Sequence, residues 1–178
     1  MKTSSRKEGH DRLSETCELV GRYLYYFSRM ELELDRCIMK VFCLKQDAAN
    51  ILTADMPIGA KLDIVGAMIE SQFSGKQRLS LLKILNKIRD VNQEDRVTIA
   101  HSTFEAHGKD TVRFHRLTVK QGKRKLKSPA WTTTDFKKKF DKLEEWSSEL
   151  RQLVNELEPY VPSLDFSDPQ NSMYLALI

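Results

Sequence analysis

This sequence of 178 residues is poor in the residues that interrupt regular structure, with only 7 Gly and 5 Pro. So few glycines leave little room for phosphate-binding loops, and the P-loop, dinucleotide-binding and nucleophile-elbow motifs are all missing from it. No apolar run approaches the roughly 18 residues that a membrane-spanning helix needs, so we expect no membrane segment. The first ten residues are polar and charged, unlike a signal peptide, which favours a cytoplasmic protein.

Cysteine and histidine are also scarce. The 3 cysteines are an odd number without a C-x-x-C pair, so we expect Cys17, Cys37 and Cys43 to be reduced, packed thiols of a cytosolic protein. The 4 histidines are spread along the chain, at His10, His101, His107 and His115. Their spacing is not typical of metal ligands. The sequence therefore predicts neither a metal site nor a cofactor.

What the sequence does have is helical periodicity. Apolar residues recur at steps of three and four over about thirty residues from Leu13, then in shorter segments at 46–54, 57–73 and 81–91. A last long helix is expected from Thr134, its N-cap, with an inner face made of Phe136, Phe140, Leu143, Trp146, Leu150, Leu153 and Leu157.

After Gly108 the period changes to alternation. The segments 111–119 and 123–127 flank a Gln-Gly turn, which predicts a β-hairpin. The fold class that follows is all-α: an up-and-down helical bundle with a small β-hairpin inserted before the last long helix. We expect 1–12 to be a flexible leader, 13–160 one helical domain and 161–178 a C-terminal tail.

The first long helix carries one anomaly. Its apolar stripe is expected at Cys17, Val20, Leu24, Phe27, Leu34, Ile38 and Val41, and the same steps place Glu31 on the stripe. A carboxylate there is costly unless a cation or a donor meets it. Glu33 and Asp35 fall off the stripe and are expected to be ordinary solvated charges.

A second anomaly follows the helix at 81–91. Asn92 and Asp95 resemble a capping box, so a new helical turn is expected near Gln93, continuing to about Thr103. This turn would carry Arg96 and His101 with four residues between them. On a straight helix, residues five apart point about 140° from each other. A local break near Asn92, or a second protomer, would be needed to focus both groups on one phosphate.

The Arg-x-x-x-x-His spacing, with small Ala100 before the histidine and Ser102 after it, resembles the signature of the HEPN family (higher eukaryotes and prokaryotes nucleotide-binding domains). The run from Phe27 to Glu31 is similar to part of that family's first long helix, and the likeness covers roughly residues 13–158. The resemblance implies a helical bundle that forms a homodimer. It also implies metal-independent ribonuclease activity in many members, with Arg and His from two protomers meeting at the dimer interface.

The chemistry of RNA cleavage by its own 2′-OH agrees with such a site. His101 could move a proton near neutral pH, and Arg96 could stabilise the charge that develops on the phosphorane. The resemblance adds Glu31 as an acidic group that faces the motif. One position departs from the family's pattern, because active members usually carry a polar residue, often Asn, where this chain has Val97.

Charge is unevenly distributed around the mild net value of +4. Residues 109–142 contain twelve Lys/Arg and three Asp, whereas residues 143–178 contain one Arg and seven Asp/Glu. A basic middle segment favours a polyanionic partner, although a solvated lysine-rich surface is the alternative. The RNA-binding residues expected in and near the hairpin are Arg113, Arg116, Lys123, Arg124, Lys125 and Lys127.

Three functions remain open at this point. The first is a HEPN-like endoribonuclease, a toxin or defence component with RNA as substrate and with an antitoxin or regulatory protein as a further partner. The second is a non-catalytic relative that binds RNA or a protein, and Val97 is the residue that separates these two. The third is a structural helical adaptor, in which Glu31 and Arg96 only hold two helices together.

Overall fold

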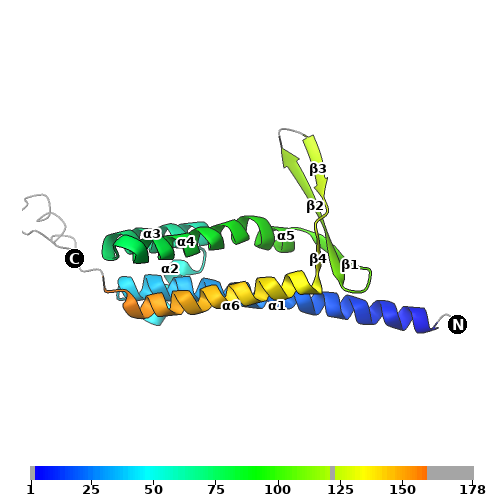
Figure 1. Cartoon of the computed structure of the whole chain (residues 1–178), viewed down its shortest axis with the longest axis horizontal. Coiled ribbons are helices and arrows are strands. Elements are labelled where there is room, and N and C mark those ends of the chain that lie inside the picture. Colours follow the sequence, from blue (N-terminus) through cyan, green and yellow to red (C-terminus); the bar gives the residue numbers. More distant parts are fainter. Residues whose placement is uncertain (1–2, 121–122, 160–178) are drawn as a thin grey trace, which may run out of the picture.

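The computed structural model describes residues 3–120 and 123–159 and is mostly helical, with a small antiparallel sheet beside the helices (Figure 1). The helices are α1 (Thr3–Val41), α2 (Gln46–Thr53), α3 (Ile58–Gln72), α4 (Gly75–Val91), α5 (Val97–Ala100) and α6 (Thr133–Glu156), with a π-helical turn, η1 (Asn92–Arg96), between α4 and α5. The strands are β1 (Thr103–His107), β2 (Thr111–Lys120), β3 (Lys123–Lys127) and β4 (Ala130–Thr132). No helix in the described ranges is long and apolar enough to cross a membrane.

The long helices α1 and α6 run side by side in the same direction (Figure 1). Two contacts show the common direction. Arg22 lies over the ring of Phe140, and farther along both helices the thiol of Cys37 donates to the carbonyl of Leu150. The short helix α2 turns the chain back, so that α3 also runs in the direction of α1 (Figure 1). In the series α1, α2, α3, α4 and α6, each helix thus runs opposite to the one before it, as an up-and-down order requires (Figure 1).

The buried stripe of α1 differs from the predicted stripe by one residue at three places, because Thr16, Tyr23 and Met30 are buried in place of Cys17, Leu24 and Glu31. Tyr23 and Met30 are buried at 0% exposure, whereas the predicted Leu24 is 40% exposed. Steps of three and four can place the stripe on either of two neighbouring positions. At Tyr23 and Met30 the neighbour with the larger apolar side chain is the buried one. The predicted inner face of α6 is confirmed at every position, from Phe136 to Leu157.

Helix ends follow local chemistry. The N-cap of α6 is Thr132 rather than Thr134: its hydroxyl accepts from the Asp135 backbone N–H, and the Asp135 carboxylate accepts from the Thr132 backbone N–H. The hydrogen bonds that the Asp135 carboxylate accepts from the Thr132 backbone N–H and from the Thr132 hydroxyl lower the pKa of Asp135. Gly75 begins α4 with a φ of +57°, which a residue with a Cβ adopts at a cost. At the other end, α1 begins at Thr3, inside the segment 1–12 expected to be a leader.

The sheet is larger than the predicted hairpin. β2 pairs with β3 as expected, but its first half also pairs with β1 on one edge and with β4 on the other. β1 and β4 were missed because both are short and lack a clear alternation of apolar and polar residues. The chain is therefore a helical body with a four-stranded antiparallel sheet rather than a purely all-α bundle.

Aromatic side chains join the sheet to the helices. The ring of Trp131 from β4 lies 4.7 Å from that of Phe114 in β2 and 5.4 Å from that of Phe136 in α6, measured between centroids. It also lies 6.1 Å from the ring of Tyr23 in α1. The lower half of β2 is thus fixed to both long helices, whereas β3 lies beyond this cluster (Figure 1).

Candidate functional site

The second half of β2 and β3 form a two-stranded arm, residues 116–120 and 123–127, that projects from the helical body (Figure 1). Paired residues of an antiparallel ladder lie on the same face, and neighbours along a strand lie on opposite faces. Arg116 pairs with Lys127, and Thr118 pairs with Lys125. Lys123 follows the same alternation, so one face of the arm carries Arg116, Lys123, Lys125 and Lys127. We call this the basic face.

The opposite face of the arm is mostly apolar, with one arginine near the tip. Leu117 pairs with Leu126, and their exposures are 60% and 63%. Val119 is 65% exposed and pairs with Arg124. The sequence analysis noted the alternation of apolar residues but did not predict that they would be uncovered.

The structure thus brings together five of the six predicted RNA-binding residues on the arm, although Arg124 lies on the apolar face. Among the side chains that the structure describes, no carboxylate lies within ion-pair distance of any of these five. Arg113 is separate. It lies at the base of the sheet, where its guanidinium meets Nε2 of His107.

A polar cluster occupies the base of the sheet below the apolar face. His115 lies 3.1 Å from Glu105 through Nε2 and 3.4 Å from the Ser128 hydroxyl through Nδ1. The hydrogen bond with His115 lowers the pKa of Glu105. In the described part of the chain, no three potential metal ligands come together. The cluster is therefore a set of cross-strand contacts at the foot of the arm.

Arg96 ends the π-helical turn rather than lying on a newly capped helix. Asn92 has helical dihedrals (φ −62°, ψ −43°), so the predicted capping box at Asn92 is wrong and the helix continues through a widened turn. π-Helical turns occur frequently at functional sites. The Arg96 guanidinium carbon is 6.0 Å from the ring centre of Phe27 in α1, and Asp95 pairs with Lys139 of α6.

His101 is exposed at the end of α5, just before β1. Its backbone N–H donates to the carbonyl of Val97 at 3.1 Å, which closes the last helical turn. Arg96 is half-buried. Of the described carboxylates, none is within ion-pair distance of the Arg96 side chain. The segment from Arg96 to His101 therefore begins with a half-buried cation and ends with an exposed imidazole.

Glu31 does not meet Arg96. Its carboxylate lies 3.0 Å from Nζ of Lys61 in α3, and Asp35 lies 2.8 Å from the same nitrogen. Burial alone would lower the pKa of Lys61, but the hydrogen bonds to Asp35 and Glu31 outweigh it, and the pKa is raised. Glu31 and Asp35 thus hold a buried lysine, whose side chain is 4% exposed.

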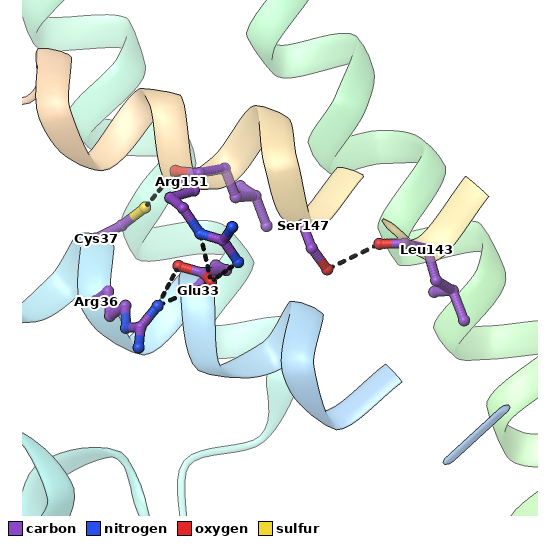
Figure 2. Close-up of polar contacts among 7 residues, drawn as sticks. Glu33, Arg36, Cys37, Leu143, Ser147 and Arg151 are labelled. Carbon is purple, nitrogen blue, oxygen red and sulfur yellow. Dashed lines mark hydrogen bonds and ion pairs between the residues drawn. The ribbon is translucent and has the colours of Figure 1, made fainter. Parts of the chain in front are cut away.

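Glu33, expected in solvent, is the buried carboxylate of α1, at 2% exposure. Figure 2 shows the Arg36 guanidinium on one side of it, at 2.9 and 3.0 Å, and that of Arg151 from α6 on the other, at 2.8 Å. The prediction failed because Glu33 is next to the α1–α6 contact, where cations from both helices reach it. This cluster ties α1 to α6.

All 3 cysteines are free thiols. Cys37 is buried as expected, and burial raises the pKa of its thiol to about 12. Cys17 and Cys43 are exposed, so the expectation of packed thiols is wrong for these two.

Comparison with known proteins gives no relative for this arrangement: no protein-family model, curated protein or solved structure matches the chain.

Proposed function

We propose that this protein binds RNA through the basic face of its arm. The observation that carries the proposal is the gathering of Arg116, Lys123, Lys125 and Lys127 on one face of a projecting ribbon, without neighbouring carboxylates among the described side chains. Phosphate contacts by lysine and arginine supply most of the sequence-independent affinity of nucleic-acid-binding proteins. If these cations served only to keep the protein in solution, they would not need to lie on the same face of the arm.

A physical argument supports a ligand over a purely structural role. An isolated two-stranded ribbon is marginally stable, and like charges on one face repel each other. A polyanion lying on the basic face would remove that repulsion. The lysines of β3 also discourage pairing of its free edge with another strand, which favours side-chain recognition over strand addition.

The test uses a triple variant, Lys123→Ala/Lys125→Ala/Lys127→Ala. Its matched control, Lys76→Ala/Lys83→Ala/Lys87→Ala, removes the same charge from exposed positions of α4. We expect the arm variant to bind fluorescent single-stranded RNA at least about tenfold more weakly at low salt, and the control to bind as the wild type does. Equal losses in both variants would show that only net charge matters. Preference for duplex DNA of equal length would contradict the RNA proposal.

A second candidate is metal-independent RNA cleavage by Arg96 and His101, as the HEPN resemblance implies. It is favoured by the π-helical turn, which ends at Arg96, and by the exposure of His101. In this reading Glu31 would not act, because it is engaged with Lys61. The imidazole would transfer the proton of the 2′-OH, and the guanidinium would stabilise the phosphorane.

Cleavage by this route makes a sharp prediction. It should persist in EDTA, give 2′,3′-cyclic phosphate ends and disappear in His101→Ala, while RNA binding by the arm remains. Val97→Asn restores the polar residue of active HEPN members, and should increase the rate if Val97 limits the site. The measurement is the chemical identity of product ends on several RNAs. If neither the wild type nor Val97→Asn cuts any of them, the catalytic candidate is excluded and binding alone stands.

A further inference from the structure

An apolar groove of about 370 Å³ lies between the end of α1 and the second half of α3. Its lining is Val41, Phe42, Ile64, Ala67, Met68, Ser71 and Gln72. None of these side chains is charged, and Phe42 is 45% exposed. Exposed apolar surface that is contiguous commonly marks a binding site.

The chain leaves its last helix at this groove. Beyond α6, the backbone N–H of Glu158 donates to Oε1 of Gln72 at 2.9 Å, and Nε2 of Gln72 donates to the Glu158 carbonyl at 2.9 Å. Gln72 is one of the groove's own residues. Glu158 is therefore held beside the groove by a pair of hydrogen bonds.

Those following residues contain a segment of matching chemistry. Residues 173–178 read Met-Tyr-Leu-Ala-Leu-Ile, six residues without a charged side chain, whereas 160–172 are mixed and include two Asp. From Ile64 to Gln72, α3 advances about 12 Å, at 1.5 Å per residue. The linker 160–172 can span several times that length, at about 3.3 Å per residue when extended.

We infer that residues 173–178 occupy this groove in the same molecule. Tethering gives such a segment an effective concentration in the millimolar range, so a contact too weak to hold a free peptide is sufficient. Burying Leu175, Leu177 and Ile178 against Phe42 and Ala67, which are both exposed, removes two apolar surfaces from water at once. The inference is independent of RNA binding, because the groove's residues belong to the end of α1 and the second half of α3, which lie away from the arm (Figure 1).

The test compares the full chain with Leu175→Asp/Leu177→Asp. Its matched control, Gln170→Asp/Asn171→Asp, adds the same charge outside the apolar segment. We expect the methyl resonances of Met68 and Ile64 to shift in the first variant and stay in place in the second. Amide exchange at 175–178 should be about tenfold slower in the wild type than in the first variant.

A second variant changes the groove instead of the segment that we expect to occupy it. Ala67→Glu places a charge at an exposed position of the lining and should release the segment to fast exchange. Asn86→Glu on the exposed surface of α4 should not. Unchanged methyl resonances, or fast exchange at 175–178 in the wild type, would overturn the inference. Contacts between labelled and unlabelled chains in a mixed sample would also overturn it, since the segment would then occupy a second copy.

Discussion

At the scale of single residues, Glu33 shows how burial and charge are reconciled on α1. The side chain of Glu33 is 3% exposed, while its partners Arg36 and Arg151 keep 44% and 50% of their side chains in solvent. The ion pair is therefore asymmetric. The arginines compensate the carboxylate for the water that it loses on burial. The arginines themselves remain half in water and do not need the carboxylate in return.

This asymmetry predicts unequal costs of substitution. Arg36→Ala/Arg151→Ala leaves a buried charge without a partner and should lower the free energy of unfolding by about 3 kcal/mol. Glu33→Gln leaves two half-exposed arginines that water can solvate, and should cost only about 1 kcal/mol. Urea denaturation measures both, with Arg12→Ala/Arg78→Ala as the control for loss of two cations. Equal costs of the two changes would show that the pair is not asymmetric.

The sequence could predict that α1 holds a buried carboxylate but not which one. Periodicity places a stripe to within one residue, because steps of three and four can be ordered in two ways. Glu31 and Glu33 are then separated only by where the cations of other helices lie. The cation that meets Glu33 is Arg151, 118 residues away in sequence, and the cation that meets Glu31 is Lys61, 30 residues away. For the same reason the Glu31–Arg96 pair could not be tested before the helices were assembled.

At the scale of elements, the contact of α1 with α3 includes the ion pairs of Lys61. Its ammonium is shared by Glu31 and Asp35, at 3.0 and 2.8 Å, so either carboxylate can keep it paired when the other is removed. Such sharing makes the two sites interact, and their effects should not add.

We therefore expect a non-additive double-mutant cycle. Glu31→Ala and Asp35→Ala should each lower the free energy of unfolding by about 1 kcal/mol, and the double variant by about 3 kcal/mol or more, because Lys61 then loses both carboxylate partners. Thermal and urea unfolding of the four proteins measure this. Additive effects, or a double variant as stable as the wild type, would contradict the shared ion pair. Lys61→Met in the double-variant background should restore part of the loss.

Several elements could be predicted because their cues are local. The long helices, the inner face of α6 and the pairing of β2 with β3 follow from apolar spacing and turn residues. The π-helical turn could not, since Asn92 and Asp95 fit a cap as well as a continuous helix. The faces of the arm follow from a register that places Arg116 opposite Lys127, which composition alone does not give.

At the scale of the whole molecule, the body and the arm are distinct parts. Aromatic packing around Trp131 fixes the foot of the sheet to α1 and α6, and the arm extends beyond this support (Figure 1). The attachment of the arm to the body was the part least accessible to sequence analysis. It depends on β1 and β4, which are short strands without a clear alternation of apolar and polar residues.

A homodimer remains a proposal at this scale, with an interface around Arg96 and α1. Leu24, 40% exposed and one turn from Phe27, is the apolar residue that we expect such an interface to bury. Leu24→Glu should then convert a dimer to a monomer in light scattering at tens of micromolar. Leu79→Glu, at another exposed leucine on α4, should leave the dimer intact. A wild type that is monomeric at this concentration would count against the dimer and against a two-protomer catalytic site.

The most direct test of RNA binding by the arm is the salt dependence of affinity. For single-stranded RNA, the logarithm of the association constant should fall linearly with the logarithm of salt concentration, by about 0.7 for each phosphate neutralised. Lys123→Ala/Lys125→Ala/Lys127→Ala should flatten that slope by about 2, while Lys76→Ala/Lys83→Ala/Lys87→Ala should leave it unchanged. The same slope in all three proteins, or no measurable binding by the wild type at low salt, would contradict the account.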